Sequence, residues 1–408
     1  MNDPRIQAGF NVGGVHLERP FKIRRLGHFG VNVLDVPKAT KFYCDLLGFA
    51  ISDPINFNRD EHTAVEKVGS GLGYFMRHGT DHHSFVLFPK RVVNARPGRE
   101  NWPKDVTINQ ITWQVGTLRE VVEGNRWLSE MKLQINRTGR DNPGSNWHTY
   151  PIGPGYHINE LYYGIEQVGW DGLSKPGSMH TKHYMAPPDL PHRSEFAEVQ
   201  AAMDNGIDIR SGCRHVDAQP ENYDVGGVLL PRPFKIERMG PVRLFYDDIE
   251  KELAFYCGML GLTVTEKIDW KGHHCVFLRA NTEHHSLALY PRALRRELGL
   301  SEHTTLMAFG LQLGSYEQLR AAREFLRGKG VTLKTLAPEQ CPGLGHSVLA
   351  IDPEGHAMQL YDYMEQIGWD GKPRPASQRR KIDNDHWPDT LDPASDSYCG
   401  ETFLGPLG

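Results

Sequence analysis

The chain has 408 residues, an apolar content of 39%, and a net charge of −4 that is spread without long runs of either sign. This composition predicts more than one globular domain, and the even charge excludes nucleic acid and anionic membrane surfaces as expected partners. No apolar run approaches the roughly 18 residues of a membrane-spanning helix. The six cysteines are far apart and form no C-x-x-C pair, so we expect a reduced, cytoplasmic protein.

The first predicted unit is a strand followed by a helix. Residues alternate in character over Leu26–Leu34, which is typical of a strand. Asp35 then has the place of an N-cap, and Pro37 lies in the first helical turn, where its missing N–H costs nothing. Apolar residues recur on one helical face until Gly48 ends the helix.

A second kind of unit begins with another predicted strand, Ile108–Val115. Thr117-x-x-Glu120 follows it with the spacing of a capping box. The same spacing returns much later as Ser315-x-x-Gln318, behind Leu311–Leu313. Strand–helix–strands is therefore expected four times.

The sequence contains an internal repeat, because motifs of its first half return in its second half at offsets of 213, 202 and 199 residues. Shared positions are candidates for structure, and positions kept in one copy are candidates for function. We expect the repeated G-W-D-G motif to form a turn with a buried tryptophan. The repeated motifs are Val12–Ile23 with Val225–Ile236, Asp81–Ser84 with Glu283–Ser286, and Glu166–Gly172 with Glu365–Gly371.

The repeat divides the chain into an N-terminal domain at 12–176, a linker at 177–224 and a C-terminal domain at 225–375. The linker is rich in Pro, His and Asp and has one predicted helix near Ser194–Met203. Residues 376–408 form an irregular tail that is available for contact with a neighbouring subunit, so we expect a homo-oligomer.

Two motifs connect these units to a known superfamily. G-H-F-x-V-x-V-x-D opens a unit at Gly27–Asp35, and H-H-S-[FL]-x-L closes the units that begin at Leu26 and Gly240. Four such units in series resemble the vicinal oxygen chelate superfamily, and within it the type I extradiol ring-cleaving dioxygenases. The resemblance implies an α+β fold of four repeated βαβββ modules in two tandem domains, each a curved mixed sheet around a central cavity.

In that superfamily, metal ligands come from the first strands of two partner units and from the last strand of the second. The resemblance places them at His28, Gln110 and Glu160. In the second copy, a proline and an alanine offer no side-chain donor, and the carboxylate has become an amide. We therefore expect a metal in the N-terminal domain and a degenerate site in a C-terminal scaffold. The aligned positions are Pro241, Ala308 and Gln359.

The extradiol pattern has two histidines and one carboxylate, the facial set of non-haem Fe(II) oxygenases. Gln110 departs from it, although a glutamine ligand is known in the glyoxalase I branch. If Gln110 is not a ligand, His148, His157 or His62 would complete the site. Fe(II) is the expected cofactor, with Mn, Zn or Ni as alternatives.

Three further residues are candidates for catalysis. His83 matches the extradiol acid–base histidine, whose neutral ring takes and returns a proton; the second copy keeps His285, so a structural role stays open. Tyr150 matches a substrate-facing tyrosine. His148 is a candidate neighbour of the metal ligands. Their counterparts in the second copy are Leu349 and Ser347.

The expected reaction is extradiol cleavage of a catechol-like aromatic with Fe(II) and O2. One alternative is a non-oxidative isomerase or lyase that uses Zn, Ni or Mn. A second alternative is a metal-free protein that binds an aromatic ligand between its sheets.

Overall fold

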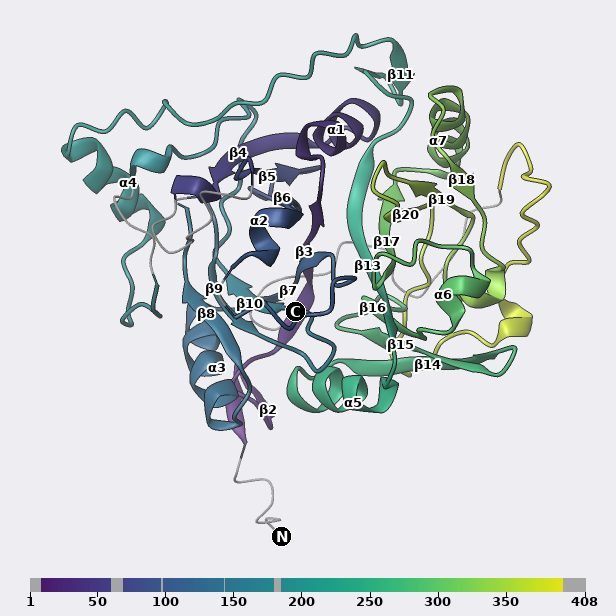
Figure 1. Cartoon of the computed structure of the whole chain (residues 1–408), viewed down its shortest axis with the longest axis horizontal. Coiled ribbons are helices and arrows are strands. Elements are labelled where there is room, and N and C mark those ends of the chain that lie inside the picture. Colours follow the sequence, from purple (N-terminus) through teal and green to yellow (C-terminus); the bar gives the residue numbers. More distant parts are fainter. Residues whose placement is uncertain (1–8, 60–68, 97, 143, 180–184, 392–408) are drawn as a thin grey trace.

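Each half of the molecule is one eight-stranded mixed sheet, and the two halves lie side by side (Figure 1). The computed structural model describes residues 9–59, 69–96, 98–142, 144–179 and 185–391. Both sheets are built from two βαβββ modules in series, so the predicted α+β fold with four repeated modules is confirmed. None of the helices in these ranges is long and apolar enough to cross a membrane.

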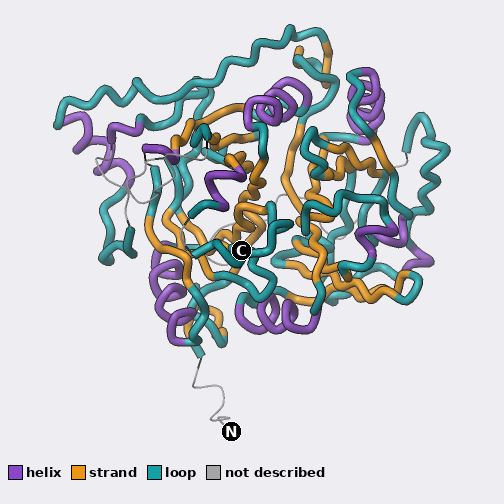
Figure 2. The backbone as a smooth tube through the Cα atoms, in the orientation of Figure 1, coloured by secondary structure: helices purple, strands orange, loops and turns teal. Residues whose placement is uncertain are grey.

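The strands are longest at the start of each half and short elsewhere (Figure 2). The first half contains β3 (Ile23–Val33), α1 (Val36–Lys41), β4 (Ala50–Asn56), β5 (Leu72–Arg77), β6 (Phe85–Pro89), α2 (Lys90–Asn94), β7 (Ile108–Val115), α3 (Leu118–Glu130), β8 (Ile135–Gly139), β9 (Trp147–Pro151) and β10 (Asn159–Tyr163). The second half contains β13 (Ile236–Tyr246), α5 (Ile249–Leu253), β14 (Thr263–Trp270), β15 (His273–Arg279), β16 (Leu287–Pro291), α6 (Leu294–Glu297), β17 (Leu306–Leu313), α7 (Tyr316–Gly328), β18 (Leu333–Lys334), β19 (Ser347–Ile351) and β20 (Ala357–Tyr361).

The strand order brings the starts of two modules together. It is β4-β5-β6-β3-β7-β10-β9-β8 in the first sheet, and the second sheet repeats it from β14 to β18. β3 and β7 pair antiparallel at the centre, and each has the last strand of its own module as a parallel neighbour. Side chains from β3, β7 and β10 therefore meet on one face of the first sheet.

The first helix begins and ends where the sequence predicts. The Asp35 carboxylate accepts a hydrogen bond from the Lys38 N–H at 3.0 Å, and Gly48 has the positive φ of 85° that favours glycine. Between them, α1 continues into a π-helical turn, Phe42–Leu46, whose aromatic side chains are buried. The apolar face of this helix therefore packs on the sheet, and this packing sets the position at which β4 begins.

The predicted capping boxes form only in part. Thr117 accepts from the Glu120 N–H at 3.2 Å, but the Glu120 carboxylate accepts from the Lys22 N–H at 2.9 Å. Its other oxygen accepts from the Thr117 hydroxyl at 3.2 Å, so this side chain contacts its own cap through the hydroxyl and also binds the residue before β3. The second half repeats the arrangement with Ser315, Gln318 and Lys235.

The repeated R-P-F-K-I motif joins the two halves. Arg232 donates from Nη1 to the carbonyls of Cys44 (3.3 Å) and Asp45 (3.2 Å), at the end of the first-half helix. In the mirror position, a Cβ on Gly261 would lie 2.1 Å from Arg19 Nη1, so the other arginine approaches the second-half helix end equally closely. Each half therefore places its motif arginine on its partner half.

The linker crosses the top of the molecule from α4 (Glu195–Asp204) to the hairpin β11 (Tyr223–Val225) and β12 (Val228–Leu230), as Figure 1 shows. Its helix is capped by Ser194, close to the predicted start. The tail packs on its own chain as far as Asp389, where the Tyr316 hydroxyl donates to the Pro388 carbonyl at 2.7 Å.

The expectation for the G-W-D-G motifs is half wrong. Both form the predicted turn, with Gly172 N–H bonded to Gly169 O and the equivalent bond in the second half, each 3.0 Å. Trp170, however, is fully exposed, at 109%. The aliphatic residue two positions earlier, Val168, occupies the buried place instead, so the turn directs the indole outward.

A buried carboxyl group that has a backbone hydrogen bond from Gly155 but no cationic partner among the described residues lies between the halves. Glu252 on α5 is 3% exposed, its Oε2 has no partner among the described atoms, and its pKa is raised to about 8 by burial and by the nearby Asp248. Its counterpart in α1 is the buried, apolar Ala39. The interface therefore favours the protonated acid.

We predict that the stability of the protein falls as pH rises through about 8 because of this group. Its pKa in the unfolded chain is near 4.3, so its contribution is complete below that pH and is lost above the folded value. Urea midpoints at pH 6 and pH 9 should differ less in Glu252→Gln than in the parent. The exposed Glu250→Gln control should follow the parent, and parallel curves for all three would contradict the assignment.

Candidate metal centre

A bulge in β3 directs His28 into the site. Leu26 pairs with Trp113 and Phe29 with Ile111, so two residues, Gly27 and His28, stand opposite one residue of β7. Bulges of this kind turn a side chain out of the regular alternation. Gly27 is required here, because a Cβ would lie 2.1 Å from the Tyr162 hydroxyl.

The residue opposite the bulge, Thr112, holds the His28 backbone from both sides. Its hydroxyl accepts from the His28 N–H at 2.6 Å and donates to the His28 carbonyl at 2.7 Å. The second half keeps the bulge between Met239 and Val242, but opposes Gly310 to Pro241. Proline has no N–H to donate and glycine has no hydroxyl, so both members of this pair changed together.

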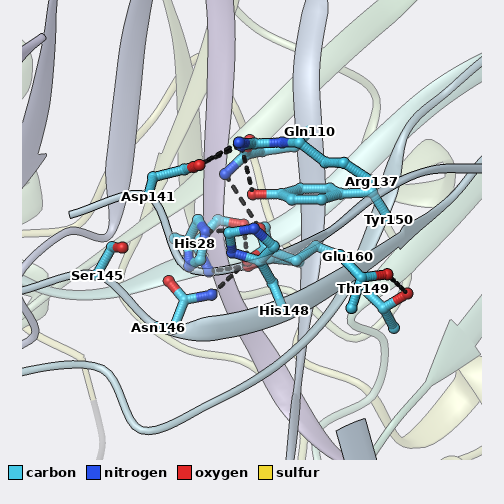
Figure 3. A network of polar contacts seen from close by, with 12 residues as sticks. His28, Gln110, Arg137, Asp141, Ser145, Asn146, His148, Thr149, Tyr150 and Glu160 are labelled. Carbon is cyan, nitrogen blue, oxygen red and sulfur yellow. Dashed lines mark hydrogen bonds and ion pairs between the residues drawn. The ribbon is translucent and has the colours of Figure 1, made fainter. Parts of the chain in front are cut away.

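The polar groups of the site converge on the buried carboxylate of Glu160 (Figure 3). Oε2 lies 3.0 Å from His28 Nε2 and accepts from Gln110 Nε2 at 3.1 Å. Oε1 accepts a short hydrogen bond from Asn146 and lies 3.7 Å from His148 Nδ1. Burial raises the pKa of this carboxyl, but the charge and hydrogen bond of His28 outweigh burial and lower the pKa overall.

These donors fit a divalent metal ion. Two ligands bonded at about 2.1 Å and at right angles stand about 3 Å apart, and the His28–Glu160 and Gln110–Glu160 contacts have this length. Counting only His, Cys, Asp and Glu, the described chain places no group of three to hold a metal. A set of three donors at this place would therefore have to include the amide of Gln110, with its oxygen in the place where its nitrogen now contacts Glu160.

Further side chains pack behind the candidate metal ligands. The ring of Tyr150 is 4.5 Å from that of His148, and Arg137 lies over the same tyrosine at 4.8 Å while pairing with Asp141. Burial is the main cause that lowers the pKa of His148 to about 4. The predicted residues His148 and Tyr150 thus sit beside Glu160, and their counterparts are Ser347 and Leu349, as the strand registers require.

His83 and His285 have equal surroundings on one side and different ones on the other. Each Nδ1 lies 3.0 Å from that of the preceding histidine, which in turn contacts a carboxylate, Asp53 or Glu266. The ring of His83 then faces His28 at 4.2 Å. Burial lowers the pKa of His83 well below its usual value.

In the second half, a guanidinium occupies the position beside the equivalent histidine. Arg243, the counterpart of Gly30, is 1% exposed and contacts His285 Nε2 and Cys341 Sγ, both at 3.4 Å. Gln359, the counterpart of Glu160, donates to the Ser347 hydroxyl at 2.8 Å. The second half therefore has a buried cation and an amide where the first has a buried anion.

The alternative third ligands have different outcomes. The structure does not bring His157 to the other candidate ligands, because its Nε2 lies 2.9 Å from the Thr305 hydroxyl at the junction of the halves. His62 lies outside the described residues. Two residues that the sequence analysis missed are Asn146 and Thr112; their replacement by Gly345 and Gly310 was the available signal.

The family of the chain follows from a model match in each half. The model of the Glyoxalase/Bleomycin resistance protein/Dioxygenase superfamily matches residues 25–141 and 238–360. The chain belongs to this superfamily. No curated protein sequence matches it.

Solved structures of dioxygenases share the fold. The 2,3-dioxygenase LapB from Pseudomonas sp. KL28 is 15% identical with a TM-score of 0.53, over 86% of this chain and 96% of that one. Homoprotocatechuate 2,3-dioxygenase from Arthrobacter globiformis is 14% identical with a TM-score of 0.51, over 88% of this chain and 85% of that one. Identities this low show the common fold alone.

We predict one metal ion per chain, bound in the first half. Glu160→Ala should abolish binding, because it removes the only anionic donor, and elemental analysis of anaerobically purified protein would measure it. Gln359→Ala changes the equivalent position and should leave the stoichiometry at one. Stoichiometric metal in Glu160→Ala would refute the ligand set.

Proposed function

We propose that the first half is a metal-dependent dioxygenase that cleaves a catechol-like aromatic ring beside its two hydroxyl groups. The observation that supports this most is the convergence of His28, Gln110 and Glu160, together with the replacement of all three at the same strand registers of the second half, where no histidine and no carboxylate remains among them. The second half would then act as a scaffold. The likeness to ring-cleaving dioxygenases supports the fold that this chemistry uses.

His28, Gln110 and Glu160 would hold the metal. Fe(II) held there would supply the redox chemistry that lets O2 react with a catechol-like substrate. For this, Gln110 must turn its amide by half a rotation, since its nitrogen now faces Glu160. Asn146 and His148 would hold the remaining carboxylate oxygen in place.

His83 is proposed as the group that moves the proton. Its neutral ring, held between His28 and His82, would accept the second catechol proton at Nε2 and return it later. Tyr150 and His148 would contact the substrate from the opposite strand. Because the site is buried, few water molecules would compete for that proton.

One observation favours a second candidate. Gln110 supplies a neutral amide where the iron enzymes of this superfamily have a second histidine, and an amide suits Zn, Ni or Mn as well as iron. A non-oxidative isomerase or lyase would use the same donors to polarise a carbonyl group. A metal-free aromatic-binding protein is the third possibility, and the metal analysis above separates it from both.

We expect Gln110 to be a weak ligand that tunes the metal. Gln110→His should keep or raise the affinity for Fe(II), because imidazole is the stronger donor, whereas Gln110→Ala should lower it. Competition with a chelator of known affinity measures both. If the alanine variant binds as tightly as the parent, the glutamine serves the fold.

The function itself is tested by oxygen uptake with a panel of catechols after loading with Fe(II). We expect a yellow ring-fission product and stoichiometric O2 consumption. His83→Gln should retain metal and substrate but lose roughly 10²–10⁴-fold in rate, the usual worth of a general acid–base.

His285→Gln is the matched control, because both histidines keep the same contact to a preceding histidine. It should change stability and leave turnover nearly intact. If both variants lose the same rate and both losses follow a common fall in Tm, the two histidines have a structural role only. Metal binding without O2 consumption would favour the non-oxidative reaction.

A further inference from the structure

A buried arginine near the candidate centre has no acidic partner. Arg99 is 8% exposed, and within the described ranges no carboxylate or carbonyl accepts from its side chain. Its guanidinium lies over the ring of Trp102, with Cζ 4.4 Å from the centroid. None of its nitrogens is among the fully enclosed, unpartnered side-chain atoms of the described residues, so the guanidinium is open to a counter-charge from outside the chain.

Arg99 lies in a segment that only the first half has at this length. The connection between β6 and β7 covers residues 90–107, whereas the one between β16 and β17 covers 292–305, four residues fewer. The longer connection contains both Arg99 and Trp102. The half with the candidate metal ligands is thus also the half with this arginine.

Trp102 connects the arginine to the centre. It packs against the cluster formed by Tyr150, Ile152 and Ile158. The Tyr150 ring contacts that of His148, whose Nδ1 lies 3.7 Å from Glu160. A continuous set of ring and aliphatic side chains therefore leads from the metal ligands to Arg99.

Other positive groups stand close to Arg99. Burial, followed by the charges of Arg96 and Arg137, lowers its pKa to about 10. Arg137 is compensated by Asp141, but Arg99 has no such partner in the described chain. Like charges gathered in this way favour an anion between or beside them.

We propose that Arg99 binds a carboxylate substituent of an aromatic substrate, whose ring lies along the side chains of Trp102 and Tyr150. This inference rests on the proposed substrate site in the first half. The planar fork of arginine matches the two oxygens of a carboxylate, and stacking on Trp102 leaves the edge of that fork available. The substrate class is therefore an acidic catechol rather than an unsubstituted one.

The test measures binding of benzoate and of its neutral isostere benzamide to metal-free protein, by NMR titration. Neither probe has catechol oxygens, so binding needs no metal and no turnover. We expect the parent to prefer benzoate, and Arg99→Met to weaken benzoate roughly 10- to 100-fold, as for loss of a hydrogen bond to a charged group. Arg99→Lys keeps the charge but not the planar fork, so its affinity for benzoate should lie between those of the parent and Arg99→Met.

Arg119→Met is the control for loss of one positive charge, because that side chain is 69% exposed and pairs only on the surface. It should bind benzoate as the parent does. Equal affinity of the parent for both probes, or unchanged benzoate binding in a folded Arg99→Met, would overturn the proposal. If the protein prefers benzoate over benzamide but takes up no metal, the anion site is supported and the proposed dioxygenase activity is refuted.

Discussion

The burial of one carboxylate governs the first half of this protein. Glu160 is removed from solvent at the centre of a sheet, and no lysine or arginine pairs with it in the described chain. A buried anion must be hydrogen-bonded or must bind a cation. The directions of His28, Gln110 and Asn146 follow from this need.

The second half shows what happens when the constraint is removed. With Gln359 in place of the carboxylate, the neighbouring strands no longer need hydrogen-bond donors. Pro241 then stands in the place of His28, and Gly310 in the place of the threonine that holds its backbone. Arg243 then extends toward His285. The two halves keep one backbone plan, including the bulge in the first strand, and differ in the charged group next to the paired histidines, Glu160 in the first half and Arg243 in the second.

The histidine pairs illustrate how structure and function separate within the repeat. The contact of each pair with its carboxylate recurs in both halves, so it belongs to the fold. What differs is the group that the second histidine faces, a ring in one half and a guanidinium in the other. A shared motif therefore gives the same local geometry without giving the same chemistry.

The sequence by itself determined the four modules, their caps and strand starts, and the set of positions that differ between the copies. These depend on local periodicity and on residues a few positions apart, which one strand or helix turn brings together. It did not determine the role of Asn146, the hydroxyl of Thr112 beneath His28, or the place of His157 at the junction. Only the tertiary structure decided these, because the register between strands sets contacts such as that of His28 with Glu160, 132 residues apart. The outward Trp170 and the position of Arg99 over Trp102 depend in the same way on packing that no local pattern encodes.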